Sequence, residues 1–179
     1  GSIESLYLLN REKKEGLGPA YLAGFTWGLE RNYTHFLECD ADGSHQPEEL
    51  RILIEKSYEN DLVLGTRWML GGKVVNWPLI RRLISRAGTF YAQKVLNLPY
   101  KDLTGGYRIY SRKALESIPF NTIATHGYGF QIEMAMRIHD NKMKIAEVPI
   151  TFIERREGTS KMSKKIVVEA LAQTTIWGF

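Results

Sequence analysis

Residues 36–42 read Phe36-Leu37-Glu38-Cys39-Asp40-Ala41-Asp42, an apolar, strand-like run that ends in two carboxylates spaced one residue apart. In open α/β sheets, ligands bind at the carboxyl ends of the strands. Two acids at such an end can coordinate one hard divalent cation, because Mg²⁺ and Mn²⁺ prefer oxygen ligands and bridge to substrate phosphates. Solvated turns also carry isolated pairs of this kind, so the surrounding sequence decides what the pair means.

Short strand-like runs alternate with helix-like segments on both sides of this motif, which predicts an α/β fold. The 179 residues, 44% of them apolar and 25% charged, suit one globular domain. Strands are expected over 6–10, 34–39, 61–66, 105–111 and 144–153, where Pro149 indicates an edge or a bend. Helices are expected over 20–31, from Gln46 onward, and over 79–96, 128–140 and 166–177.

The chain carries a formal net charge of +4, and its basic residues form several clusters rather than one block. Such clusters suit phosphates, nucleic acid or an anionic membrane surface, although solvated helix faces share this composition. The paired acids disfavour nucleic acid, because they repel a polyanion. No apolar run reaches the ~20 residues that cross a bilayer. The clusters lie at Arg81, Arg82 and Arg86, at Arg155 and Arg156, and at Lys161, Lys164 and Lys165.

Two arginines are expected at the same rim as the paired acids. Arg67 directly follows the expected strand 61–66, and Arg81 follows a Trp-Pro turn near the start of a helix. Arginine binds phosphate through two parallel N–H groups. A metal-binding pair and two arginines at one edge of a sheet therefore predict a site for phosphate chemistry.

A second polar motif reads Asp102-Leu103-Thr104-Gly105-Gly106-Tyr107-Arg108. Its two glycines permit a tight turn or a close approach of the backbone to a ligand. From the residues alone, Asp102 is a base, an electrostatic group or a turn cap.

Seven pieces of the chain, in order, resemble the polyprenol- and dolichol-phosphate mannose synthases, which are inverting glycosyltransferases of the GT-A type. The resemblance implies a GT-A fold, which is Rossmann-like with a mainly parallel sheet. The first four pieces are Glu15 to Tyr21, Asp40 to His45, Gly65 to Trp68 and Asp102 to Arg108. The last three are Gly127 to Glu133, Glu147 to Ile150 and Arg155 to Met162.

The resemblance also implies roles for individual residues. Asp40 and Asp42 match the metal-binding pair, and Ser44 is a further candidate because some relatives carry a metal-contacting glutamine there. Asp102 matches an acidic position near the reacting sugar. The expected phosphate-binding residues are Arg67, Arg81 and Ser85, together with Arg155 and Lys161 in a mobile loop. Arg67, Arg81 and Asp102 are the expected catalytic residues.

One departure from the family pattern concerns the start of the chain. Family members begin with a β-α-β unit that cradles the nucleotide, and this unit is absent here. Gly1-Ser2 matches either the tail of that unit or a tag. We expect residues 1–161 to form a truncated GT-A catalytic domain. Residues 162–179, basic and then apolar, are expected to form an amphipathic helix at a membrane interface.

Together these features predict metal-dependent, inverting transfer of mannose from a nucleotide sugar, GDP-mannose, to polyprenyl or dolichyl phosphate. The implied cofactor is Mg²⁺ or Mn²⁺, and the implied place is the cytoplasmic face of a membrane, with no nucleic-acid partner. One alternative is a polyprenyl-phosphate glucosyltransferase or a related sugar transferase. Others are an inactive fragment, suggested by the absent first unit, and a nucleic-acid-binding module that uses the basic clusters.

Overall fold

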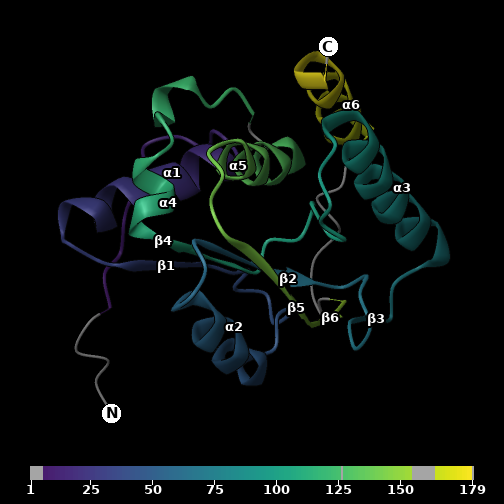
Figure 1. Ribbon diagram of the computed structural model, residues 1–179, viewed down its shortest axis with the longest axis horizontal. Helices are drawn as coiled ribbons and strands as arrows, with labels where there is room; N and C mark the ends of the chain where they lie inside the picture. The colour runs from purple at the N-terminus through teal and green to yellow at the C-terminus, as the bar shows by residue number, and fades with distance from the viewer. Residues whose placement is uncertain (1–5, 126, 155–163, 179) are drawn as a thin grey trace.

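The computed structural model describes residues 6–125, 127–154 and 164–178 (Figure 1). Its first half contains α1 (Leu17–Glu30), β1 (His35–Glu38), η1 (Pro47–Glu49), α2 (Leu50–Ser57), β2 (Leu62–Thr66), β3 (Lys73–Val75) and α3 (Leu79–Leu96). Its second half contains β4 (Arg108–Ser111), α4 (Arg112–Glu116), η2 (Phe120–Thr122), α5 (Tyr128–Asp140), β5 (Ile145–Pro149), β6 (Thr151–Ile153) and α6 (Lys164–Gly178).

A four-stranded sheet in the order β1-β4-β2-β5 forms the centre of the fold. β2 pairs in parallel with β5, from Leu62 opposite Ile145 to Thr66 opposite Pro149. β4 runs antiparallel to both of its neighbours, β1 and β2. Strands β1, β2 and β5 therefore point the same way, which confirms the expected mainly parallel α/β sheet.

Helices cover both faces of this sheet, with α2 on one side and α1, α4 and α5 on the other (Figure 1). β2 is buried over its whole length. Because successive side chains of a strand point to opposite faces, Leu62 and Leu64 join the core beneath α1 and α5. Val63 joins the smaller core that includes Leu53 of α2. The α5 side of the larger core includes Phe130, Met134 and Ile138, which share one helical face.

Two expected strands differ in the structure. Residues 6–10 form no strand, and Leu6, Tyr7 and Leu8 are exposed, so this prediction was wrong. Local strand propensity does not hold a strand whose backbone N–H and C=O groups lack a neighbouring strand. The expected strand 144–153 is instead two strands, β5 in the main sheet and β6 paired in parallel with β3. The bend indicated by Pro149 is thus confirmed.

A buried arginine fastens the loop before β4 to helix α5. Arg108 is 1% exposed. Its guanidinium donates to the carbonyl oxygens of Leu103 at 2.9 Å, Gly105 at 2.8 Å and Gln131 at 2.6 Å. A buried guanidinium needs such partners, because an unpaired buried charge is very costly. This arrangement places the 102–106 loop and α5 beside each other.

Helix α6 packs against α3 and α5 (Figure 1). Thr174 and Ala170 face inward, whereas Val168 and Ile176 are exposed. Within the part of the chain that the structure describes, no helix combines the length and apolar character needed to cross a membrane. The expected domain boundary at residue 161 lies outside the described residues and stays a prediction.

The packing of α1 on β1 gives a matched pair of alanine variants. A Cβ atom at Gly28 would lie 2.5 Å from Cε1 of the packed Phe36 ring, so Gly28→Ala should destabilise the protein by about 1–3 kcal/mol. A Cβ atom at Gly24, in the same helix, would meet nothing within 4 Å, so Gly24→Ala should stabilise it by up to ~1 kcal/mol. Urea unfolding of both variants measures the difference. Equal changes in the two would contradict this packing.

Candidate active site

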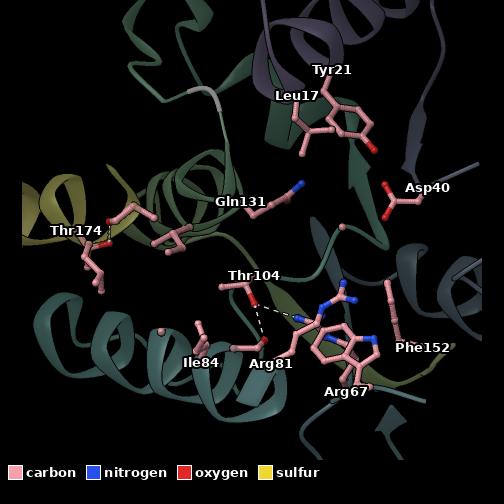
Figure 2. A pocket seen from close by; sticks show the side chains of 17 residues that line it. Leu17, Tyr21, Asp40, Arg67, Arg81, Ile84, Thr104, Gln131, Phe152 and Thr174 are labelled. Atoms are coloured by element: carbon pink, nitrogen blue, oxygen red, sulfur yellow. Dashed lines mark hydrogen bonds between the residues drawn. The ribbon is translucent and has the colours of Figure 1, made fainter. Parts of the chain in front are cut away.

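A pocket opens where α1, α3, α5 and α6 approach the ends of β1 and β2 (Figure 2). Four of the residues that the sequence singled out line it: Asp40, Arg67, Arg81 and Ser85. Asp40 closely follows β1 and Arg67 directly follows β2, and these strands point the same way. Figure 2 shows the Asp40 carboxylate pointing inward on one side, with Arg67 and Arg81 on another. Asp40 and Arg67, which were expected at one rim because each follows a strand, do lie at the same pocket.

Three other expected site residues, Asp42, Ser44 and Asp102, do not line the pocket. Asp42 and Ser44 belong to the same loop as Asp40, and Asp102 lies behind Arg67. Arg155 and Lys161 fall outside the described residues, so their expected contacts with phosphate stay predictions.

The loop that carries the two acids is held by hydrogen bonds of its own. The backbone N–H of Asp40 donates to Nδ1 of His45 at 3.0 Å. The N–H of Ser44 donates to Oδ1 of Asp42 at 3.1 Å. Asp40 and Asp42 are exposed, whereas Ser44 is buried and its carbonyl oxygen accepts from the N–H of Ile153. The backbone of the acid loop is thus held at Asp40 and at Ser44.

This donor set suits a divalent cation that is shared with a phosphate ligand. Asp40 and Asp42 provide carboxylate oxygens, the ligands that Mg²⁺ and Mn²⁺ prefer. Among the described residues, no group of three or more His, Cys, Asp or Glu side chains could hold a metal ion. An ion held by these two acids would have to take its remaining ligands from substrate phosphates and water, as Mg²⁺ commonly does.

Arg67 and Asp102 form a buried ion pair behind the pocket surface. Nε and Nη2 of Arg67 donate to the two carboxylate oxygens of Asp102 at 2.6 and 2.8 Å, and the Arg67 backbone N–H donates at 3.1 Å. Arg67 is 6% exposed and Asp102 is 1% exposed. Burial alone would raise the pKa of the Asp102 carboxyl, but the charge and hydrogen bonds of Arg67 hold that pKa below its usual value. Asp102 is therefore ionised, and both of its carboxylate oxygens accept hydrogen bonds from Arg67. This arrangement suits a role in positioning Arg67.

Arg81 and Ser85 lie one helical turn apart on α3 and face the pocket together. The guanidinium of Arg81 stacks over the Trp77 ring, with its Cζ 4.0 Å from the ring centroid, and donates to Glu154. Oγ of Ser85 lies 3.4 Å from Oγ1 of Thr104, which also accepts from Arg67 at 2.9 Å. Thr104 therefore links Arg67 to Ser85, and Arg81 faces the same pocket one helical turn before Ser85.

An aromatic wall, defined here as Trp77, Phe152 and His45, connects the acid loop to the arginines. Phe152 meets Trp77 edge-on at 5.3 Å between ring centroids and His45 edge-on at the same distance. The Cζ atom of Arg67 lies 5.2 Å from the Trp77 centroid and 5.6 Å from that of Phe152. Such cation–π contacts stabilise a desolvated guanidinium. In the sequence, this wall is marked by Trp77 beside Pro78 and by His45 at the end of the Asp40 to His45 piece, and neither indicated its role.

Gln131 is a pocket residue to which the sequence analysis assigned no role. It is buried, and its Nε2 donates to Oε1 of Glu38, whose other oxygen accepts from the Tyr110 hydroxyl at 3.0 Å. Burial raises the pKa of the Glu38 carboxyl to about 7, a rise limited by the charge of Arg108 and by these hydrogen bonds. Gln131 stood inside a quoted motif, but only the tertiary contact with Glu38 reveals why it faces the pocket.

The pocket has a second, mainly apolar part that extends between α3, α5 and α6. Its walls include Ile84 and Gly88 of α3, Ile132 of α5, and Ala170 and Leu171 of α6. One continuous pocket therefore joins a charged end, suited to phosphates, to an apolar end.

Known proteins share both the sequence and the fold of this chain. Residues 4–118 match the family described as glycosyl transferase family 2. An undecaprenyl-phosphate mannosyltransferase from Micrococcus luteus is 51% identical over 174 residues, which are 97% of this chain and 72% of that protein. A polyprenol monophosphomannose synthase from Mycolicibacterium smegmatis is 44% identical over 176 residues, which are 98% of this chain and 66% of that protein.

Solved structures of glucosyl-3-phosphoglycerate synthase from Mycobacterium tuberculosis share the fold at 16% identity. The complex with phosphoglyceric acid has a TM-score of 0.66 and covers 92% of this chain and 55% of that one. The complex with Mn²⁺, UDP-glucose and phosphoglyceric acid has a TM-score of 0.62 over the same shares. At this identity the likeness shows the fold alone. The sequence matches confirm the expected resemblance, and the chain belongs to glycosyl transferase family 2 as a glycosyltransferase with the GT-A fold.

Proposed function

We propose that this glycosyltransferase moves mannose from GDP-mannose to a polyprenyl or dolichyl phosphate, with inversion at the anomeric carbon. The observation that carries the proposal is the pocket, in which Asp40, Arg67 and Arg81 lie at one end and a mainly apolar part lies at the other. A polyprenyl or dolichyl phosphate has two matching parts, a charged phosphate and an apolar hydrocarbon chain. The names of the relatives at 51% and 44% identity support both the sugar and the acceptor.

The acceptor phosphate needs little activation in this mechanism. A phosphate monoester is largely ionised near pH 7 and is itself the nucleophile, so no strong general base is required. The protein has to align two anionic groups that repel each other and to neutralise their charge. Arg67 and Arg81 are the described cations at the pocket that suit this role, and we assign Asp102 to the positioning of Arg67.

A divalent cation completes the proposed site. Asp40 and Asp42, with Ser44 as a further candidate, would hold Mg²⁺ or Mn²⁺, which would offset the charge of the leaving nucleoside diphosphate. The Mn²⁺ and UDP-glucose complex of the structural neighbour supports the use of a metal by this fold. We favour mannose over the glucosyltransferase alternative, because the names of the relatives at 51% and 44% identity specify mannose.

The proposed place of action is the cytoplasmic face of a membrane, because the acceptor's hydrocarbon chain stays in the bilayer. Helix α6 exposes Val168 and Ile176 beside its packed face, which is compatible with contact at a lipid surface. Arg155 and Lys161 remain candidates for phosphate binding on the strength of the family resemblance.

A transfer assay with undecaprenyl phosphate in detergent tests the proposed reaction. We expect the intact enzyme to transfer mannose from GDP-mannose and to transfer glucose from UDP-glucose at a rate at least about tenfold lower, because the relatives' names specify mannose. Analysis of the anomeric configuration of the product checks the inversion. Preferred transfer from UDP-glucose would overturn the assignment of the sugar.

Metal dependence is tested at Asp42, which is exposed in its loop and whose loss should leave the fold intact. Asp42→Ala should lower the transfer rate by at least about 100-fold, because one of the two expected protein ligands is lost. Excess EDTA should abolish transfer by the wild type, and Mn²⁺ should restore it. The claim is wrong if Asp42→Ala, or the wild type in EDTA, keeps full activity.

Arg67→Lys and Arg81→Lys test the role of the two guanidinium groups. Lysine keeps the charge but loses the planar fork, so each variant should lose at least about tenfold in kcat/KM for the acceptor, or roughly 1.4 kcal/mol. Arg51→Lys, on the exposed face of α2 and not among the pocket residues, is the matched control and should behave as wild type. Wild-type kinetics for both pocket variants would make these arginines structural only.

A further inference from the structure

His45 is buried although it directly follows the exposed acid loop. It is 7% exposed, and its ring stacks on Tyr107 with 4.6 Å between centroids and 12° between planes. The edge contact with Phe152 closes another side. By shape alone, a phenylalanine would fit these aromatic neighbours.

This packing does not explain why the residue at position 45 is a histidine, with two ring nitrogens, instead of a phenylalanine. Nδ1 accepts from the N–H of Asp40 at 3.0 Å, so in the neutral ring the proton is on Nε2. Nε2 is buried and has no hydrogen-bond partner among the described residues. A buried, unpaired donor lowers stability. The histidine therefore carries a cost that phenylalanine would avoid, and what it gains is the bond from Nδ1 to Asp40.

That bond belongs to a frame that holds both acids. The Asp40 backbone is fixed by the side chain of His45, and the Asp42 carboxylate accepts from the N–H of Ser44. The backbone of His45 forms an antiparallel bridge with Phe152, and the Ser44 carbonyl oxygen accepts from Ile153 at 3.0 Å. The base of the acid loop is thus attached to β6.

Strand β6, to which the base of the acid loop is attached, also contacts the residues that hold Arg81. Phe152 packs on Trp77, over which Arg81 stacks, and Glu154 directly follows the strand and accepts from Arg81. The position of the acid loop relative to the arginines therefore depends on the contacts of His45 and Phe152.

We propose that His45 is a positioning residue whose Nδ1 fixes the Asp40 backbone so that Asp40 and Asp42 meet one divalent cation together with a nucleoside diphosphate. The inference rests on the metal site of the proposed function and adds a residue to it. This role of His45 differs from a packing role, because it depends on the acceptor atom Nδ1 and not on the shape of the ring. Groups that orient metal ligands typically change metal affinity by 10–100-fold when they are removed.

Titration of the intact protein with Mn²⁺ in the presence of GDP, followed by calorimetry, tests the inference without catalysis. His45→Phe keeps an aromatic ring but loses the acceptor, and its Kd for Mn²⁺ should rise at least about tenfold. Its thermal midpoint should fall by no more than that of His35→Phe. This control makes the same substitution at an exposed histidine on β1 that does not line the pocket.

Two further variants separate the acceptor atom from the ring. The side-chain oxygen of asparagine can replace Nδ1, whereas that of glutamine reaches toward the position of Nε2. His45→Asn should therefore bind Mn²⁺ within about threefold of wild type, and His45→Gln should resemble His45→Phe. His45→Asn and His45→Gln therefore test whether the Nδ1 acceptor is needed for Mn²⁺ binding, even if His45→Phe does not fold.

The outcomes distinguish this inference from the proposed function. If the wild type binds no Mn²⁺ with GDP, the proposed metal site fails and the role of His45 fails with it. If the wild type binds but His45→Phe binds equally well, only the inference is overturned. Equal affinities for His45→Asn and His45→Gln would overturn it as well, because the position of the acceptor would then not matter.

Discussion

The buried pair of Arg67 and Asp102 is the interaction on which the rest of the site depends. It joins the end of β2 to the loop before β4 through two parallel N–H···O bonds and a backbone bond. Because both charges are buried, loss of either partner would leave the other uncompensated, a cost of about 3–5 kcal/mol. Arg108 then fastens the same loop to α5. The pocket's charged wall is thus set by paired groups with fixed geometry, which side-chain motion cannot easily change.

This arrangement also addresses the electrostatic problem of the proposed reaction. Two phosphate-bearing substrates repel each other, so the protein must offer positive charge before they arrive. The aromatic wall of Trp77, Phe152 and His45 holds Arg67 and Arg81 at one side of the pocket and the acid loop at another. Burial lowers the pKa of His45 to about 4, helped by the charge of Arg67, so this ring is neutral near pH 7. Uncharged rings therefore separate the acid loop from Arg67 and Arg81, while Asp102 and Glu154 are the carboxylates that pair with these two arginines.

Much of this could be predicted from the sequence, and what could not depends on tertiary contacts. The helices expected over 79–96 and 128–140 match the observed bounds of α3 and α5, and strand ends placed Asp40 and Arg67 at one rim. Residues 6–10 have strand-like composition, but pairing decides whether a strand forms. The contacts of His45 with Asp40, of Gln131 with Glu38 and of Arg81 with Glu154 join distant or unpatterned positions. Sequence periodicity does not reveal these contacts, because a side-chain hydrogen bond depends on where a single donor atom and a single acceptor atom lie in the folded chain.

The charged and the apolar end of the pocket offer different kinds of interaction, and this difference affects which acceptors the enzyme would select. Guanidinium groups recognise phosphate through directional hydrogen bonds, so the charged end tolerates little change in its ligand. The apolar end is lined by Ile84, Ile132 and Leu171 with the small Gly88 and Ala170. Burial there is non-directional and scales with area. In the proposed reaction, discrimination between acceptors therefore arises at the phosphate, while the apolar end contributes affinity that depends little on the exact form of the chain.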